Sequence, residues 1–171
     1  MFVILVGPKG SGKTHVGRTL EQSLGIHFFH VEPLWMAFYA DCDAQGRPRN
    51  TQDGIERVHP QIAHALQAHE HVCVETTGAS SEILDGLLSL WPANRTLVVR
   101  LWAPLDTCLM RIEGRDQTEQ IQMSADRIQT VYEKSVMASI PSHVTLDTSV
   151  LSEEEIVSRI STGLDADRRP F

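Results

Sequence analysis

Eight consecutive residues near the start of the sequence have the types and spacing that phosphate binding requires. They match G-x-x-x-x-G-K-[S/T] at every fixed position and read Gly7-Pro8-Lys9-Gly10-Ser11-Gly12-Lys13-Thr14. Gly7, Gly10 and Gly12 allow the backbone to curl until its N–H groups reach phosphate oxygens. The Lys13 ammonium suits the β- and γ-phosphates of a nucleotide, and the Thr14 hydroxyl suits a magnesium ion.

The neighbours of this loop favour the same interpretation. Phe2 to Val6 is an apolar run typical of a buried strand, and Thr14 to Leu24 has apolar residues at helical spacing. The N–H groups at the start of such a helix, beside Ser11, attract anions. A glycine-rich turn without a ligand is the alternative interpretation. A strand before the loop and a helix after it indicate instead a P-loop that binds ATP and Mg²⁺.

Two carboxylates follow predicted strands and are candidates for the chemistry. Glu75 ends the apolar run Val72–Val74, and Glu32 lies one residue beyond Phe28–Val31. If both strands flank the first one, both carboxylates lie at the sheet edge that holds the phosphates. We predict that Glu75 joins Thr14 at the metal, that Glu32 contacts the substrate, and that one of these acids accepts the proton of an attacking hydroxyl. The alternative is a pair of exposed acids at strand ends.

Three arginines in the last third of the chain suit a lid over a transferring phosphoryl group. Arg111 and Arg115 are four residues apart, hence on one face of a helix, and Arg127 lies further along. Positive charge on a mobile cover stabilises the transferring group and excludes water. We predict a lid over 111–127, in which Arg111 and Arg115 bind nucleotide, Arg115 also acts in catalysis, and Arg127 binds substrate. The alternative is a solvated helix face paired with nearby acids.

Short apolar runs alternate with amphipathic stretches, which predicts a single α/β domain over 1–171 with a mostly parallel sheet and helices on both faces. The predicted strands are Phe2–Val6, Ile26–Val31, His71–Thr76, Thr96–Trp102 and Val144–Leu146. The predicted helices are Thr14–Leu24, Gly54–Ala68, Ser81–Leu90, Pro104–Ile112, Gln117–Met137 and Glu153–Ile160. Capping boxes are expected at Asp116–Glu119 and Ser152–Glu155.

The composition limits the partners of the chain. Its net charge is −7, so the surface as a whole repels nucleic acid and anionic membranes. No apolar run approaches the roughly 18 residues of a membrane span. Cys42, Cys73 and Cys108 have no C-x-x-C spacing, which indicates reduced thiols in a cytoplasm. The sequence leaves the oligomeric state open.

These features together resemble the P-loop kinases that include the nucleoside monophosphate, gluconate and shikimate kinases. The resemblance covers nearly the whole chain. Besides the P-loop it rests on the arginines of 111–127, on Leu24–Phe29 leading to an acid, and on Asp147–Glu155, which is similar to the family's final strand-to-helix turn beside the adenine. It implies a three-layer P-loop NTPase fold with a five-stranded parallel sheet in the order 2-3-1-4-5. It also implies that the segment after the second strand, here 33–70, holds the acceptor.

The shikimate kinase pattern is the most similar within this group, but the acceptor region departs from it. That family carries two aspartates where this chain has His30 and Glu32, so His30 is a further candidate for the site. Its glycine triplet after the third strand is reduced here to Gly78. Its acceptor-binding arginine motif is not evident between Pro33 and His59. Shikimate is therefore not the acceptor we expect.

The acceptor segment mixes aromatic and basic residues. Aromatic side chains near arginines can stack a planar base and clamp an anion, and we predict that Trp35, Arg57 and Gly78 contact the substrate. The alternative is core packing by the aromatics and a solvated loop over Asp41 to Thr51.

Three functions fit these residues. The leading hypothesis is a kinase that moves the γ-phosphoryl of ATP to a hydroxyl or phosphate group of a small molecule, either a nucleoside or nucleotide or a sugar-like compound. A nucleotide-dependent switch or ATPase module is the second, although the N-K-x-D motif of guanine recognition is not evident. A polynucleotide kinase is the third, for which Arg47, Arg49 and Arg57 would have to supply a basic channel.

Overall fold

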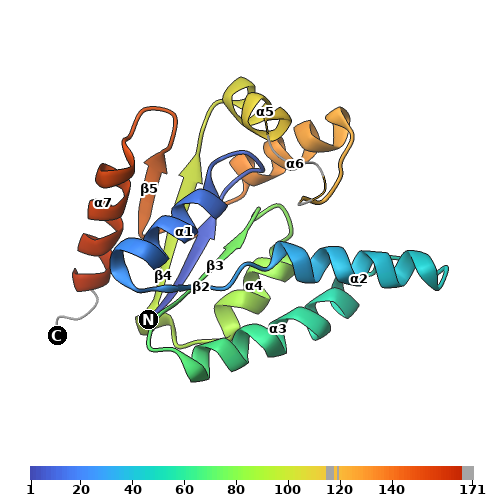
Figure 1. Cartoon of the computed structure of the whole chain (residues 1–171), viewed down its shortest axis with the longest axis horizontal. Helices are drawn as coiled ribbons and strands as arrows, with labels where there is room; N and C mark the ends of the chain where they lie inside the picture. Colours follow the sequence, from blue (N-terminus) through green and yellow to red (C-terminus); the bar gives the residue numbers. More distant parts are fainter. Residues whose placement is uncertain (115–117, 119, 167–171) are drawn as a thin grey trace.

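The computed structural model describes residues 1–114, 118 and 120–166 and has a parallel sheet at its centre (Figure 1). The strands are β1 (Phe2–Val6), β2 (His27–Phe28), β3 (Val72–Thr76), β4 (Thr96–Trp102) and β5 (Val144–Asp147). They pair in parallel in the order β2-β3-β1-β4-β5. The fold class and strand order implied by the kinase resemblance are therefore confirmed.

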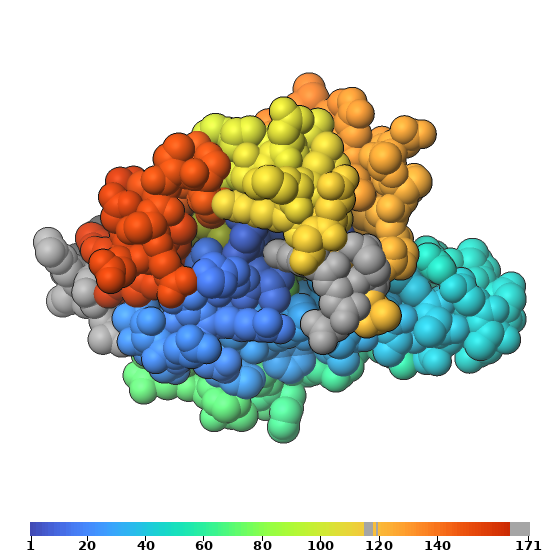
Figure 2. Space-filling model, turned by 45° about the horizontal axis from the view of Figure 1, so that its top comes forward, coloured from blue at the N-terminus to red at the C-terminus, as the bar shows by residue number. Residues whose placement is uncertain are grey.

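Helices cover both faces of this sheet. α1 (Lys13–Leu24) and α7 (Glu153–Ala166) pack on one face, while α3 (Thr51–Ala68) and α4 (Ser81–Ser89) pack on the other. α2 (Glu32–Ala44) runs beside α3, and its outer end projects from the body of the molecule (Figure 2). The remaining helical elements are η1 (Ala93–Arg95), α5 (Leu105–Glu113) and α6 (Ala125–Met137).

The alternation of side chains along β1 explains the two layers. All five residues of β1 are fully buried, and successive side chains of a strand point to opposite faces. Phe2, Ile4 and Val6 join the core beneath α2, α3 and α4, whereas Val3 and Leu5 join the core beneath α1 and α7. The central strand is therefore apolar on both faces, as parallel sheets require.

The strand register brings the two sequence motifs together. Leu5 lies opposite Glu75 and Val6 lies opposite Thr76, so β1 and β3 end side by side. The P-loop leaves β1 at that point, and the amide of Gly7 donates to the carbonyl oxygen of Thr76 at 3.1 Å. Glu75 is thereby placed next to the phosphate-binding loop.

The structure differs from the predicted elements at the second strand. Six residues were expected there, but β2 holds His27–Phe28, because the chain turns at Val31 into α2. Glu32 and Pro33 are favoured in the first turn of a helix, where a carboxylate meets the positive end of the helix dipole and proline lacks an N–H to satisfy. α2 itself was not predicted.

The helix expected over 117–137 is shorter than predicted. α6 begins at Ala125, where the Ser124 hydroxyl accepts a hydrogen bond from the amide of Arg127 at 3.3 Å. The Asp116–Glu119 capping box includes positions outside the described residues. The second capping box is confirmed, since the Ser152 amide donates to the Glu155 carboxylate at 2.8 Å and the Glu155 amide donates to the Ser152 hydroxyl at 3.2 Å.

Of the helices that the structure describes, none has both the length and the apolar character needed to cross a membrane. All three cysteines are free and buried. Burial raises the pKa of the Cys73 thiol well above its ordinary value, and Glu75 adds to this shift.

Candidate active site

The P-loop, residues 7–14, joins β1 to α1 at the carboxyl edge of the sheet. Gly10 has a φ of 85°, and a Cβ there would lie 2.4 Å from the carbonyl oxygen of Cys108, so a side chain is excluded. Gly12 precedes α1, and within the described residues no side chain caps this helix. The first N–H groups of α1 therefore remain for an anion. Ser11 Oγ is also buried without a hydrogen-bond partner among the described residues.

Lys13 lies inside this loop. Its side chain is buried, and its Nζ donates to the carbonyl oxygen of Pro8 at 2.9 Å. An ammonium held by a loop carbonyl is positioned on the concave side of the loop, where phosphate oxygens would sit. The predicted phosphate-binding residues thus come together in one cradle.

Thr14 and Glu75 are the candidate ligands for a magnesium ion. Thr14 Oγ1 lies 3.0 Å from both carboxylate oxygens of Glu75, to which it donates. Mg²⁺ prefers oxygen ligands and usually keeps water and phosphate beside one or two protein groups. One hydroxyl and one carboxylate fit that requirement. No group of three or more His, Cys, Asp or Glu suited to a metal occurs among the described residues.

His30 lies between the two candidate carboxylates. Its Nε2 is 3.4 Å from Glu75 Oε1 and 4.0 Å from Glu32 Oε2. The same nitrogen is buried without a hydrogen-bond partner in the described part of the chain. The ring stacks on Phe28 with 5.7 Å between centroids, which fixes the imidazole between Glu75 and Glu32.

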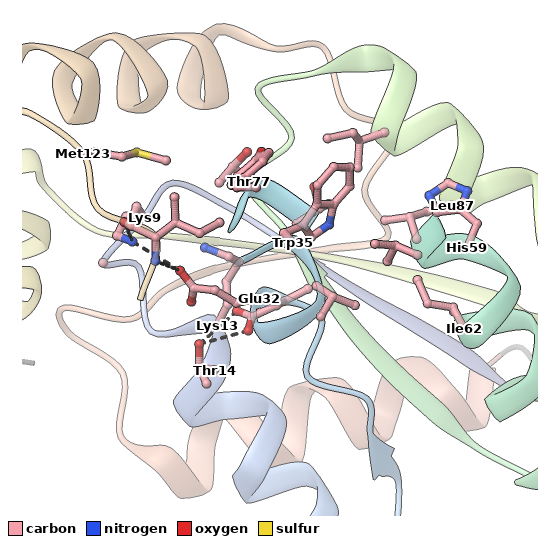
Figure 3. Close-up of a pocket in the computed structure, with 18 of the residues that line it drawn as sticks. Lys9, Lys13, Thr14, Glu32, Trp35, His59, Ile62, Thr77, Leu87 and Met123 are labelled. Carbon is pink, nitrogen blue, oxygen red and sulfur yellow. Dashed lines mark hydrogen bonds and ion pairs between the residues drawn. The ribbon is translucent and has the colours of Figure 1, made fainter. Parts of the chain in front are cut away.

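Glu32 is anchored through one of its carboxylate oxygens. Its Oε1 accepts from Lys9 Nζ at 3.3 Å and from the Ile121 amide at 2.9 Å. Lys9 Nζ also donates to the Ile121 carbonyl oxygen at 2.8 Å. These contacts tie the P-loop, the start of α2 and the segment after α5 together (Figure 3). They fix the Glu32 carboxylate while its Oε2 lies on the His30 side.

Arg111 connects the P-loop to the turn after β5. Its Nη1 donates to the Gly10 carbonyl oxygen at 3.3 Å and to Thr148 Oγ1 at 2.9 Å. Its Nη2 donates to the Thr148 carbonyl oxygen at 2.8 Å. The guanidinium is therefore placed beside the P-loop, where the nucleotide is predicted to bind.

The other two lid arginines are placed differently. Arg115 lies outside the described residues, and its role stays a prediction. Arg127 is exposed on α6. Burial raises the pKa of the Tyr39 hydroxyl, and the charges of Arg49 and, less strongly, Arg127 oppose this rise. Arg127 does not line the cavity described next, and its predicted contact with the substrate stays a prediction.

A cavity of about 180 Å³ joins the P-loop to a compartment between α2, α3 and α4 (Figure 3). Charged and hydroxyl groups line one end, and apolar side chains line the other. The cavity residues that the structure describes are Lys9, Gly10, Gly12, Lys13, Thr14, Val31, Glu32, Trp35, Tyr39, Val58, His59, Ile62, Glu75, Thr76, Thr77, Ile83, Leu87, Ile121 and Met123. Trp35 thus lines the cavity, and its predicted contact with the substrate stays a prediction.

Among the described residues, Arg57 and Gly78 do not line this cavity, and their predicted contact with the substrate stays a prediction. Arg57 is exposed and bonds to Asp41 of α2. Residues two apart on a helix point in nearly opposite directions, so Arg57 faces outward when His59 faces inward. Gly78 packs against Val6 of β1, because a Cβ on Gly78 would lie 2.6 Å from Val6 Cγ1.

Several cavity residues were not predicted from the sequence. His59 had a detectable signal, because it stands among Ile55, Val58 and Ile62 on the apolar face of α3, where a polar residue is unusual. Lys9 had none, since it occupies a variable position of the P-loop motif. Its contact with Glu32 depends on the path of the chain after β2.

His59 is enclosed at the apolar end. Its side chain is 8% exposed, and its Nε2 is buried without a partner among the described residues. Burial lowers the pKa of this histidine below the ordinary value of 6.5. The imidazole is therefore neutral at neutral pH.

Comparison with protein families matches residues 2–139 to the family described as AAA domain. Among curated proteins, shikimate kinase from Thermus thermophilus is 25% identical over 166 residues, which span 93% of this chain and 87% of that protein. The family match over residues 2–139 includes every described residue that lines the cavity.

Solved structures have the same fold. Shikimate kinase from Aquifex aeolicus superposes with a TM-score of 0.66 at 22% identity, covering 98% of both chains. A gluconokinase from Sinorhizobium meliloti superposes with a TM-score of 0.66 at 21% identity, covering 96% of this chain and 91% of its own.

Proposed function

We propose that this chain, which belongs to the AAA domain family, transfers the γ-phosphoryl of Mg-ATP to a hydroxyl group of its acceptor. The chain is a P-loop small-molecule kinase of the shikimate and gluconate kinase group. The observation that carries this proposal is the continuous cavity, which joins the P-loop to an enclosed second compartment. A phosphate site without an acceptor compartment would serve hydrolysis equally well.

The phosphate end binds and orients the nucleotide. Lys13 and the N–H groups at the start of α1 hold the phosphates. Thr14 and Glu75 would hold Mg²⁺, which neutralises phosphate charge when bound. Hydrogen bonds from Arg111 hold the P-loop beside the turn at Thr148. The segment around Ile121 excludes water from the phosphate end of the cavity, and hydrogen bonds to Lys9 and Glu32 hold it there.

Glu32 is the carboxylate that we assign to the acceptor hydroxyl. The Thr14 hydroxyl contacts both carboxylate oxygens of Glu75, which suits a role of Glu75 beside the metal ion. Glu32 is held through Oε1 by Lys9 and Ile121, so its Oε2 is positioned to accept the hydroxyl proton. His30 Nε2 lies 3.4 Å from Glu75 Oε1 and 4.0 Å from Glu32 Oε2, between the two acids.

Mass spectrometry of a broad panel of hydroxyl compounds, incubated with the purified protein and Mg-ATP, tests this function. We expect phosphorylated product from at least one compound and none without protein. Normal ATP binding with no phosphorylated product from the panel would contradict the assignment. A switch or ATPase module would instead release inorganic phosphate with every compound.

We also propose that the protein is located in the cytoplasm. ATP and reduced thiols are features of the cytoplasm, and the three cysteines are free and buried. The cytoplasmic location stays a prediction, which fractionation of cells that produce a tagged chain would check.

A further inference from the structure

The acceptor compartment has a different chemistry from the phosphate end of the cavity. Most of its lining is apolar, and the residues are Val31, Trp35, Tyr39, Val58, His59, Ile62, Ile83 and Leu87. Trp35 is 9% exposed, Val58 and Ile62 are each 1% exposed, and Leu87 is 3% exposed. Such a surface binds a ligand by removing its apolar area from water.

Within the described part of the chain, no cationic side chain lines the acceptor compartment. Among the described residues, the cations that line the cavity are Lys9 and Lys13, both at the phosphate end. Lys9 is already held by Glu32 and the Ile121 carbonyl oxygen.

The arginines of the acceptor segment lie on its outer surface. Arg47, Arg49 and Arg57 are exposed and bond to Gln45, Asp43 and Asp41, respectively. Among the residues that the structure describes, a carboxylate or phosphate on the acceptor body would therefore find no cationic partner in this compartment, and burying it there is strongly unfavourable.

His59 is one of the polar side chains of this compartment, with Trp35 and Tyr39. Its ring edge packs against α4, since a Cβ on Gly86 would lie 2.4 Å from His59 Cε1. Its Nε2 has no hydrogen-bond partner among the described residues. A neutral imidazole donates or accepts a hydrogen bond but supplies no charge. Figure 3 shows His59, Ile62 and Leu87 on the side of Trp35 away from Lys9.

We propose that the acceptor is an uncharged alcohol with an apolar ring or chain, whose body packs on Trp35 and whose second polar group bonds to His59. This proposal rests on the proposed kinase function. The acceptor oxygen forms a bond to the γ-phosphorus of ATP, and the bond from that phosphorus to the β–γ bridging oxygen breaks. Glu32 takes the hydroxyl proton, and ADP leaves.

Two compounds of the same size and frame test the charge requirement. 4-(Hydroxymethyl)benzamide is neutral, whereas 4-(hydroxymethyl)benzoate carries a carboxylate at the same position. We measure their binding by calorimetry in the presence of Mg²⁺ and an unreactive ATP analogue. We expect the amide to bind at least about tenfold more tightly, because the buried carboxylate lacks a cation. Equal or tighter binding of the acid, or no binding of the amide, would overturn the proposal.

Binding and transfer separate this proposal from the kinase assignment. If the amide binds preferentially but neither it nor any compound of the hydroxyl panel receives a phosphoryl group from Mg-ATP, the kinase assignment fails and the compartment assignment stands. If shikimate or gluconate is phosphorylated in preference to neutral alcohols, the kinase assignment stands and the neutral acceptor is wrong.

A His59→Arg variant sharpens the result. A guanidinium in the compartment should shift the preference toward the acid, whereas His64→Arg, on an exposed position of the same helix, should leave it unchanged. If His59→Arg does not fold, as judged by circular dichroism, the comparison of the two compounds on the unaltered protein still decides.

Discussion

The two ends of the cavity are built in different ways. The phosphate end comes from one continuous stretch of chain, residues 7–14, to which Glu75 is added by the pairing of β1 with β3. The acceptor end is assembled from α2, α3 and α4. Hydrogen bonds and backbone geometry fix the phosphate end, whereas side-chain packing shapes the acceptor end. Substrate choice can therefore change in this fold without disturbing phosphoryl transfer.

Replacing Lys13 by alanine gives the largest effect that we expect. The change removes the ammonium that faces the phosphates, so kcat should fall by about 10³-fold or more and ATP binding should weaken. Steady-state kinetics with the best acceptor measures both effects. The matched control is Lys134→Ala, an exposed lysine on α6. Unchanged kinetics in the Lys13 variant would refute the phosphate-site assignment.

Replacing Glu75 by glutamine should separate chemistry from binding. The amide keeps the shape of the side chain but removes the charge beside Thr14, so kcat should fall by about 10²-fold while nucleotide affinity changes far less. Glu82→Gln, at an exposed position of α4, serves as control. Equal losses of turnover and affinity would indicate that Glu75 positions the loop instead.

The difference between the ends also explains what the sequence predicts. The P-loop could be predicted from the sequence because its residues are consecutive and each fixed position has one physical role. Glu75 was readable because an acid after a buried strand has a defined place in a parallel sheet. Both depend on short-range order, and the strand order followed from the kinase resemblance.

The acceptor end was not readable in the same way. No helix was predicted over Glu32–Ala44, so the buried face that Trp35 and Phe38 share was not recognised. Arg57 was predicted to bind substrate from its type, although the helical phase of α3 turns it outward, while His59 faces the cavity. Which face of a helix lines a cavity depends on its packing against helices distant in sequence, and residue spacing does not contain that information.

Replacing Gly54 by alanine tests whether the acceptor end can be altered separately. A Cβ at this position would lie 2.1 Å from Trp35 Cζ3, so the indole must shift. We expect the KM for the acceptor to rise about tenfold while the KM for ATP stays unchanged.

Gly163→Ala on α7 is the matched control, because a Cβ there would lie 3.3 Å from the nearest atom, Leu97 Cδ1. A parallel rise of both KM values in the Gly54 variant would show that the two ends are not independent.

The smallest expected effect is on the pH dependence of stability. Burial lowers the pKa of folded His59 below 6.5, so the unfolded chain binds a proton that the folded chain resists. This histidine therefore favours the folded state fully above pH 6.5 and loses that contribution as pH falls toward its lowered pKa. His59→Gln should reduce the loss of stability between about pH 7 and about pH 5.

Urea unfolding at several pH values measures this slope. His64→Gln, at an exposed position of α3, should retain the slope of the unaltered protein. An identical slope in the His59 and His64 variants would mean that His59 is already solvated in the folded state.

We expect the phosphate end and the acceptor end of the cavity to act on one phosphoryl group. This expectation is tested most directly by following label from γ-labelled Mg-ATP into either a neutral aromatic alcohol or inorganic phosphate. The structure predicts that the label appears on the alcohol, that its transfer requires Lys13, and that little label is lost to water while the alcohol is present. Label recovered as inorganic phosphate, at a rate that the alcohol does not change, would contradict this expectation.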